Sequence, residues 1–263
     1  MARYQVVLAY DGTDFLGSQR QANSRTVQSE LEKALRKISW QGKSILLAGR
    51  TDTGTHASGQ VVAFDLDWGH GSDKLQDALN AHLPGDMAVR DVKAAAADDF
   101  HPRFDATSRC YRYRLFCAGV RDPLRERYAW RVWPAVTDLT PLAGIWPGTH
   151  DFAAFGTPPR PGGNTVRTVM SAEWKKQGDE WIFDIQADAF LYRMVRRLVY
   201  VQVAVGQARL PAETLARALE NRPEVSPRGS ARGVRKETQG KIPAGLAPAS
   251  GLTLIEVRYD NLV

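Results

Sequence analysis

The chain has 263 residues, which is enough for one large domain or for two domains of ordinary size. Its 43% apolar and 24% charged residues are typical of globular proteins and exclude disordered, collagen-like and disulfide-rich classes. No signal-peptide pattern precedes the first strand-like residues, and no apolar run reaches the roughly 18 residues of a membrane span. With Cys110 and Cys117 as its two cysteines, the sequence predicts a reduced, cytoplasmic protein without contact to a membrane.

The net charge of +6 is concentrated in the second part of the chain. Residues 1–105 carry 12 basic and 14 acidic side chains, and the remainder carries 23 basic against 15 acidic. Arginine supplies 19 of those 23, and its planar guanidinium suits contacts to phosphate. This imbalance is compatible with a nucleic-acid partner, although a basic surface that serves only solubility explains it equally well.

Hydrophobic periodicity in residues 1–105 predicts the element order β-α-β-β-α-β. Alternation gives a strand over residues 4–9, and a helical period gives a helix over 27–38 with Thr26 as its N-cap. The other expected elements are strands over 44–48, 60–66 and 87–92 and a helix over 75–82 capped by Ser72. In this split βαβ arrangement, two helices cover one face of an antiparallel sheet and leave the other face free to bind.

The second part of the chain repeats this order less clearly. The expected elements are strands over 109–116, 165–173, 181–187 and 252–259, a weak helix over 139–145 and a long helix over 189–205. The predicted fold class is therefore α+β, with two ferredoxin-like or RRM-like β-α-β-β-α-β halves whose antiparallel sheets join into one mixed sheet. A boundary near Asp105 divides the chain into an N-terminal subdomain of residues 1–105 and a basic C-terminal subdomain of residues 106–263.

A basic stretch over residues 221–249 is too polar to belong to a core. Glycine and proline alternate there with six basic side chains, at Arg222, Arg228, Arg232, Arg235, Lys236 and Lys241. Two interpretations remain open, a solvated surface loop and a basic arm that lies along a phosphate backbone.

The most informative segment is GRTDTGTHA at residues 49–57, directly after a short predicted strand. Gly49 and Gly54 bracket Arg50 and Asp52 on a tight loop, where backbone can approach a ligand closely and side chains can be held out of the core. An aspartate between glycines is, however, also an ordinary turn residue, and a loop arginine is often a surface ion-pair partner. Spacing alone leaves these alternatives open.

Six segments, in the same order along the chain, are similar to signature segments of the tRNA pseudouridine synthase A family. GRTDTGTHA resembles the family's GRTDAGVHA, and residues 165–169 resemble its RT-containing loop. The other four are YDGTDFLGSQRQ at residues 10–21, FHPRFDATSRCYRYRLF at 100–116, ADAFLYRMVRR at 187–197 and APASGLTLIEVRY at 247–259. The resemblance implies the pseudouridine synthase fold and spans residues 10 to 259.

The resemblance also implies a reaction, the isomerisation of uridine to pseudouridine at positions 38, 39 and 40 of the tRNA anticodon stem-loop. It assigns catalysis to Asp52, flipping and bracing of the nucleotide to Arg50, stacking on the extruded base to Tyr111 and pairing with Asp52 to Arg196. No hydride and no water is transferred, so neither a metal nor an organic cofactor is expected. The implied partners are tRNA and a second copy of the chain.

Other positions follow from the resemblance more weakly. Arg103, Arg109 and Arg167 are expected to contact tRNA phosphates, whereas His56 is expected to be structural and Asp11 to fix a turn. Departures from the family pattern include Ser18, where a tryptophan is usual, Thr53 and Thr55 in place of small apolar residues, and Tyr200 in place of glycine.

Two hypotheses from other classes remain. Two RRM-like halves without catalysis would bind RNA on their sheets, but the aromatic pattern of such modules is missing from the sequence. A nucleoside or glycoside hydrolase would want a pair of carboxylates, and the signature loop contains one.

Overall fold

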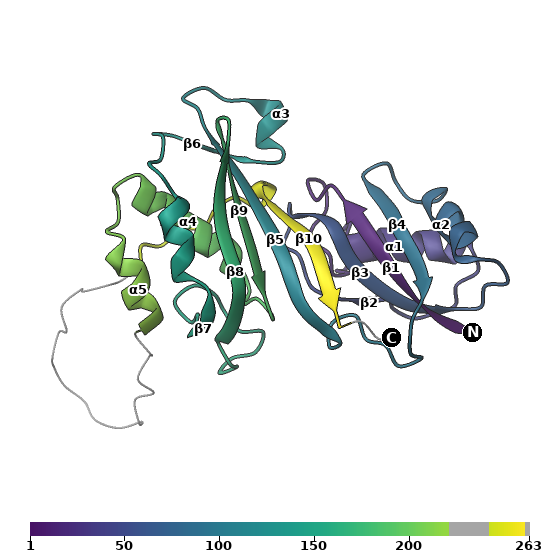
Figure 1. The fold of residues 1–263 in the computed structure, drawn as a ribbon. Coiled ribbons are helices and arrows are strands. Elements are labelled where there is room, and N and C mark those ends of the chain that lie inside the picture. The colour runs from purple at the N-terminus through teal and green to yellow at the C-terminus, as the bar shows by residue number, and fades with distance from the viewer. Residues whose placement is uncertain (221–241, 261–263) are drawn as a thin grey trace.

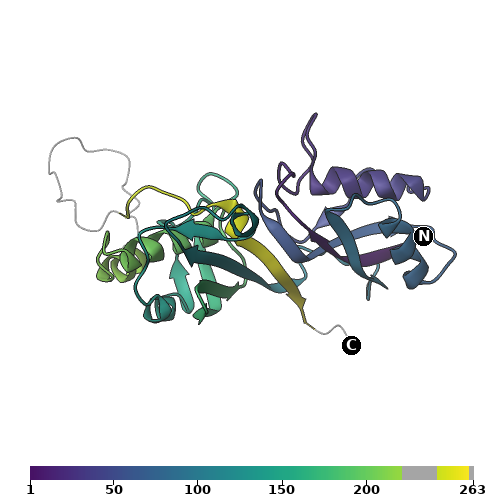
Figure 2. The ribbon, with the colours of Figure 1, turned by 90° about the horizontal axis from the view of Figure 1, so that it is seen from above.

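The computed structural model describes residues 1–220 and 242–260, in which ten strands form one sheet. Eight strands follow in the order β4-β1-β3-β10-β5-β9-β8-β7, while β2 pairs with β3 and β6 pairs with β5. Figures 1 and 2 show β10, in yellow, in the middle of the molecule, with the N-terminal elements on one side and the remaining elements on the other. The predicted α+β class with one joined sheet is confirmed.

The N-terminal half follows the predicted order of elements. It contains β1 (Ala2–Tyr10), α1 (Val27–Lys37), β2 (Leu46–Leu47), β3 (His56–Leu66), α2 (Ser72–Asn80) and β4 (Met87–Ala94). The even-numbered residues of β1 from Tyr4 to Tyr10 are buried, because every second side chain of a strand points to the same face. Leu31 and Leu35 of α1 join them in one core, and Figure 2 shows α1 lying along this face of the strands.

The C-terminal half repeats the strand order of the first and adds short elements. Its elements are β5 (Ala106–Cys117), α3 (Pro123–Glu126), β6 (Trp130–Val132), η1 (Thr140–Ile145), β7 (Gly148–Asp151), β8 (Val166–Gln177), β9 (Glu180–Ala187), α4 (Met194–Gly206), α5 (Glu213–Glu220), η2 (Ala249–Gly251) and β10 (Leu252–Tyr259). The order β10-β5-β9-β8 matches β4-β1-β3-β2 position for position. The assignment of residues 1–105 and 106–263 to separate subdomains stays a prediction.

The two halves meet where β3 and β10 run parallel. The parallel register has two residue pairs, Thr253 with His56 and Leu254 with Ala57. A Cβ atom on Gly59 would lie 2.1 Å from the carbonyl oxygen of Ile255, so the backbones approach more closely there than a side chain permits. This short joint brings the end of the chain against the strand that follows the GRTDTGTHA loop.

Each half has its own hydrophobic core, and both cores lie on the same face of the sheet. Leu254 and Val257 of β10 complete the N-terminal core, whereas Leu252 belongs to the C-terminal core. Tyr111 of β5 packs against both cores and pairs in register with Leu254. Tyr111 therefore lies on the helix-bearing face, at the point where the helices of one half give way to those of the other.

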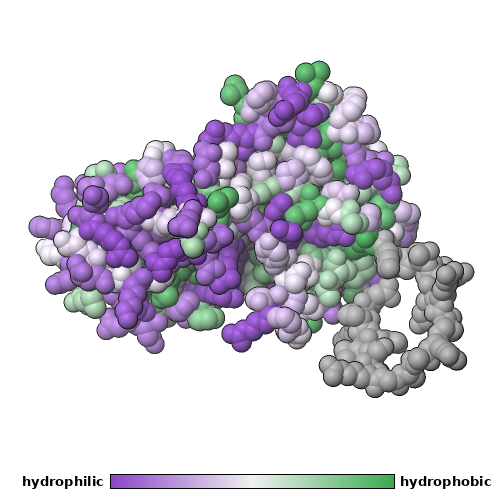
Figure 3. Space-filling model, turned by 180° about the vertical axis from the view of Figure 1, so that it is seen from behind, coloured by the Kyte–Doolittle hydropathy of each residue, from purple (hydrophilic) through white to green (hydrophobic). Residues whose placement is uncertain are grey.

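The opposite face of β5 and β9 is polar. Arg112 pairs with Asp184 at 2.7 Å, and Arg114 pairs with Glu180 on the same face. Figure 3 shows the molecule from the other side, on which α1 lies, with hydrophilic side chains over most of the N-terminal half and a hollow between the two halves. Within residues 1–220 and 242–260, no helix has the length and hydrophobicity that a bilayer crossing requires.

Several local predictions need correction. The N-cap of α2 is Gly71, and Ser72 is the first helical residue rather than a capping side chain. Helix α4 begins at Met194, five residues after the predicted start, because Arg193 adopts a left-handed conformation with φ of 63°. The weak helix over 139–145 is a 3₁₀ helix. Most of the basic stretch, residues 221–241, lies outside the described residues, so its two interpretations stay open.

Candidate active site

The GRTDTGTHA loop connects β2 with β3 and is held by hydrogen bonds on both sides of Thr51. The backbone N–H of Thr51 donates to the hydroxyl of Ser18 at 2.8 Å, and the backbone N–H of Ser18 donates to the carbonyl of Thr51 at 3.1 Å. Gly17, with φ of 82°, makes this approach possible, since a Cβ atom there would lie 3.1 Å from the same carbonyl. The residue before Asp52 is thus fixed to the segment that enters α1.

A buried polar cluster supports the loop from below. The hydroxyl groups of Tyr10 and Thr51 lie 2.8 Å apart, and the amide of Gln60 donates to the carbonyl of Gly49 at 3.0 Å. Burial raises the pKa of the Tyr10 hydroxyl, so that this group stays neutral and serves as a hydrogen-bonding group. Strands β1 and β3 supply these side chains, so the sheet itself positions the loop.

The far end of the loop is anchored by His56. Its Nδ1 accepts the backbone N–H of Gly12 at 3.0 Å, and its Nε2 donates to the carbonyl of Arg127 at 3.1 Å. Burial lowers the pKa of His56, which favours the neutral ring that this pair of bonds requires. Asp11 binds the hydroxyl and the backbone N–H of Thr13 and so holds the turn after β1. Both residues have the local contacts that the sequence analysis expected of structural groups.

Asp52 meets Arg196 across the two halves of the molecule. Nη1 of Arg196 donates to Oδ2 of Asp52 at 2.6 Å, and its Nε donates to the carbonyl of Ala247 at 2.8 Å. The Asp52 side chain is 21% exposed and that of Arg196 is 13% exposed. No hydrogen bond from the described residues reaches Oδ1 of Asp52, so one carboxylate oxygen is held by Arg196 and the other is not. The predicted contact between these residues is present, and their roles stay predictions.

Tyr111 lies on the sheet beside this pair and is backed by a second aromatic ring. Phe190 contacts it edge to face, with ring centroids 5.1 Å apart. Burial is the main cause that raises the pKa of Tyr111, and the charge of Asp52 raises it further. The phenol is therefore neutral near pH 7, and its ring offers an apolar surface within electrostatic range of the carboxylate.

Two of the predicted arginines are exposed near the loop. Arg50 projects from the loop itself and has no hydrogen-bond partner among residues 1–220 and 242–260. Arg103 is exposed as well, and its guanidinium lies 5.7 Å from the ring centroid of Phe104. Both guanidinium groups are accessible to a ligand, as the assignments to bracing and to tRNA contact require.

Arg109 and Arg167 have a different environment from that expected of phosphate ligands. The guanidinium of Arg109 donates to backbone carbonyls of Ala48, Arg103, Ala106 and Asp188. Arg167 donates to the carbonyls of Asn164 and Val166 beside its own strand. Arg109 thus ties the strand before the loop to β5 and β9. Contact of either residue with tRNA stays a prediction.

The structure adds residues that the sequence analysis did not assign to the site. Ser18, Tyr10 and Gln60 position the loop, and Phe190 supports Tyr111. The signal for Phe190 was its place in the segment that also contains Arg196. Ser18, which departs from the family pattern, binds the loop directly through its hydroxyl. The candidate site lies on the helix-bearing face, not on the free face that the sequence analysis favoured.

This arrangement suits chemistry by one carboxylate. Asp52 is held by a guanidinium, has one oxygen without a hydrogen bond from the described residues and lies within electrostatic range of the Tyr111 ring. No other carboxylate among the described residues binds Arg196, and Asp52 is the one carboxylate of the signature loop.

Comparisons with known proteins agree with these features. A family model described as tRNA pseudouridine synthase matches residues 6–105 and 145–260. Proteins named tRNA pseudouridine synthase A are similar over most of their length. Those of Chloroflexus aurantiacus and Geobacillus kaustophilus are 38% and 37% identical, each over 98% of this chain and 89% and 95% of their own. That of Halalkalibacterium halodurans is 40% identical over 84% of this chain and 85% of its own. Tyr111 and Arg109 fall between the two matched stretches.

Proposed function

This chain belongs to the tRNA pseudouridine synthase family, and on that premise we propose that it isomerises uridine to pseudouridine in tRNA. The proposed target sites are positions 38, 39 and 40 of the anticodon stem-loop. The observation that carries the proposal is the Asp52–Arg196 pair, in which a loop of one half presents a single carboxylate to a helix of the other. We further propose that the protein acts in the cytoplasm as a homodimer.

The reaction conserves all atoms of the substrate. The bond from ribose C1′ to uracil N1 breaks, a bond from C1′ to uracil C5 forms, and the proton on C5 leaves while N1 gains one. Asp52 assists cleavage through its unbound oxygen, by attack on the sugar, by addition to the pyrimidine ring or by removal of a ribose proton. Because neither hydride nor water is transferred, the proposal includes no metal and no organic cofactor.

A nucleotide stacked in an RNA stem cannot reach Asp52, so it must be flipped out at a cost of a few kcal/mol. Arg50 is accessible beside the carboxylate and is proposed to brace the gap that the flipped nucleotide leaves. Tyr111 is proposed to stack on the extruded uracil, a contact worth about 1–3 kcal/mol per base. Arg103, Arg109 and Arg167 are proposed to contact the tRNA backbone, with Arg109 reaching it only if its carbonyl contacts rearrange.

The experiment that tests the proposal compares wild type with Asp52→Asn on unmodified tRNA. Chemical mapping of pseudouridine should detect product with wild type. The variant should lose at least about a thousandfold in rate, as when a residue that acts on the reacting atoms is removed. Binding of tRNA should persist, because the asparagine side chain has the same shape as that of aspartate.

Equal product from both proteins would refute the role of Asp52. Release of free uracil by wild type would indicate a hydrolase, and binding without product would indicate an RNA-binding protein.

A further inference from the structure

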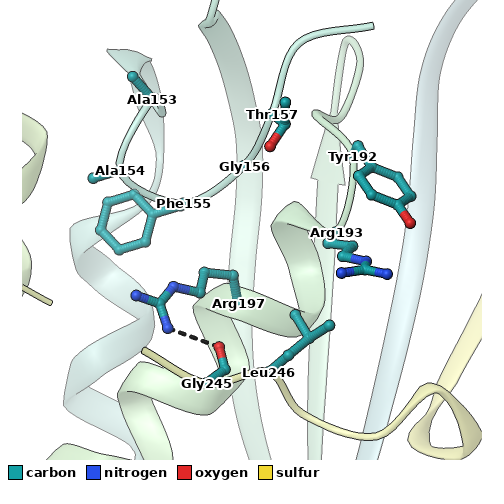
Figure 4. Close-up of a pocket in the computed structure, with 10 residues that line it drawn as sticks. All are labelled: Ala153, Ala154, Phe155, Gly156, Thr157, Tyr192, Arg193, Arg197, Gly245 and Leu246. Carbon is teal, nitrogen blue, oxygen red and sulfur yellow. Dashed lines mark hydrogen bonds between the residues drawn. The ribbon is translucent and has the colours of Figure 1, made fainter. Parts of the chain in front are cut away.

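A pocket of about 470 Å³ opens beside the first turn of α4. Its lining comes from the segment after β7, from the start of α4 and from the extended segment before η2, namely Ala153, Ala154, Phe155, Gly156, Thr157, Tyr192, Arg193, Arg197, Gly245 and Leu246. Figure 4 shows these residues and the hydrogen bond from Arg197 to the carbonyl of Gly245. The site described above does not use this pocket.

The pocket adjoins the catalytic pair. Arg197 holds the carbonyl of Gly245 at 2.7 Å, and Arg196 holds that of Ala247 at 2.8 Å. Leu246, between these two carbonyls, lines the pocket, while the other end of the Arg196 guanidinium binds Asp52. Arg193 is the residue directly before α4 and precedes Arg196 by three positions in the chain.

The shape of the pocket is fixed by backbone contacts. The backbone N–H of Tyr192 donates to the carbonyl of Thr157 at 2.9 Å, and the reverse bond measures 3.3 Å. A Cβ atom on Gly156 would lie 2.6 Å from Cβ of Leu191, so glycine permits the two segments to close against each other. These contacts hold two of the lining segments together.

The chemistry of the lining is cationic and aromatic. The ten lining residues include two arginines and no carboxylate. Arg193 has no hydrogen-bond acceptor among the described residues, and its guanidinium lies 4.7 Å from the ring centroid of Tyr192. Tyr192 is 52% exposed. A guanidinium ordered by an aromatic ring, next to an apolar wall, matches the way proteins hold a phosphate together with a stacked base.

We propose that this pocket holds the nucleotide that adjoins the target uridine in the RNA strand. Arg193 binds its phosphodiester, and Tyr192 and Leu246 contact its base. The pocket shares Leu246 with the segment whose next carbonyl binds Arg196, and this placement beside the Asp52–Arg196 pair favours the neighbouring nucleotide over the target itself as the ligand. This proposal rests on the proposed function, because it takes Asp52 as the point at which the target is held.

The first test maps the phosphate that Arg193 contacts. A series of tRNAs carries one neutral methylphosphonate at successive positions around the target, and each is assayed with wild type and with Arg193→Asn. Asparagine removes the charge and tolerates the left-handed backbone at this position. One methylphosphonate next to the target should raise the KM of wild type roughly tenfold and leave the KM of Arg193→Asn unchanged. The slope of log affinity against log salt concentration should be smaller by about one for this variant. Arg90→Asn, an exposed arginine on β4, is the matched control and should respond to every RNA as wild type does.

The second test concerns the base. Tyr192→Ala should raise KM about fivefold to tenfold with little change in kcat, the lower range expected for a lost stacking contact, whereas Tyr192→Phe should retain the wild-type value. An abasic nucleotide next to the target should abolish the difference between Tyr192→Ala and wild type.

The outcomes separate this proposal from the proposed function. Affinity for the same RNAs is measured alongside product formation, so the pocket is tested even without turnover. If wild type forms pseudouridine and Arg193→Asn responds to every methylphosphonate as wild type does, the pocket proposal fails while the function stands. The proposal also fails if the methylphosphonate that affects wild type but not Arg193→Asn lies far from the target. If wild type forms no pseudouridine, but one methylphosphonate beside positions 38–40 weakens its binding and not that of Arg193→Asn, the proposed reaction fails and the pocket is a phosphate site of an RNA-binding protein.

Discussion

The two halves of the molecule contribute to the site in different ways. The N-terminal half holds Asp52 through its backbone, with Ser18, Tyr10 and Gln60 binding the loop on which the carboxylate stands. The C-terminal half contributes long cationic side chains, which reach from α4 across the carbonyls of the segment before η2. The N-terminal half thus supplies a rigid loop, and the C-terminal half supplies positive charge. In agreement with this division, residues 1–105 carry a slight excess of acidic side chains.

Among substitutions that leave Asp52 in place, removal of the contact between the halves should have the largest effect. Arg196→Ala leaves Asp52 and the carbonyl of Ala247 without their donor in a site where both side chains are mostly buried. We expect a loss of about 3 kcal/mol in transition-state stabilisation, or roughly a hundredfold in kcat. Single-turnover kinetics on unmodified tRNA measures this directly.

The matched control for that experiment is Arg112→Ala. Arg112 forms a two-pronged pair with Asp184 on the polar face of the sheet, where both groups are considerably more exposed. Exposed pairs contribute about 0–1 kcal/mol, so activity should change little. Equal losses in the two variants would show that the Asp52–Arg196 pair has no special part in the reaction.

The support of the loop from the N-terminal half should matter next. Ser18→Ala leaves the buried N–H of Thr51 without its acceptor, which costs about 1–3 kcal/mol. We expect kcat to fall roughly tenfold without a rise in KM, because the substitution displaces Asp52 and leaves the RNA contacts in place. Ser24→Ala, whose hydroxyl donates at 3.3 Å to a nearby carbonyl outside the loop, should leave both constants unchanged.

A smaller effect is expected from the hydroxyl of Tyr111. Because burial keeps this phenol neutral, we expect Tyr111→Phe to retain turnover within about tenfold of wild type, since the stacking surface is preserved. Tyr111→Ala, which removes the ring, should lose considerably more. A loss in Tyr111→Phe as large as in Tyr111→Ala would instead assign a proton transfer to the hydroxyl.

The smallest effect concerns pH and His56. Its pKa in the folded protein is lower than the ordinary value of 6.5. Near this pH the His56 ring therefore binds a proton more readily in the unfolded chain than in the folded one. The contribution of neutral His56 to the free energy of unfolding is complete above pH 6.5 and declines as the pH falls below that value. We expect His56→Gln to reduce the loss of Tm between pH 7 and pH 5 by a degree or two, as about 1 kcal/mol corresponds to about 2–4 °C at this size. If His56→Gln lost as much Tm between pH 7 and pH 5 as wild type does, a neutral His56 ring with a hydrogen bond at each nitrogen would be contradicted.

Periodic segments of the chain could be predicted, and irregular ones could not. The final strand over 252–259 and the helix capped by Thr26 agree with the structure because their burial patterns are regular. The start of α4 was misplaced because a left-handed residue has no signature when that residue is an arginine. Strands β6 and β7 were missed since three or four residues show no period.

The candidate site was predictable where a motif carried it. The loop around Asp52 was identified from its sequence, and so was the partner Arg196. The groups beneath the loop were not, because Tyr10 and Gln60 lie 41 and 11 residues from the atoms that they bind. The environment of Arg109 was equally hidden, since its carbonyl partners come from three separate segments.

The joint between β3 and β10 also orders the events of biosynthesis. Strand β10 is the last element of the described chain to leave the ribosome, yet it supplies Leu254 and Val257 to the core that the first strands began. The nascent N-terminal half therefore carries an open apolar seam during most of translation. Since the same strand seats Tyr111 opposite Leu254, a protein cut short before Leu252 would hold the signature loop without the floor beside it.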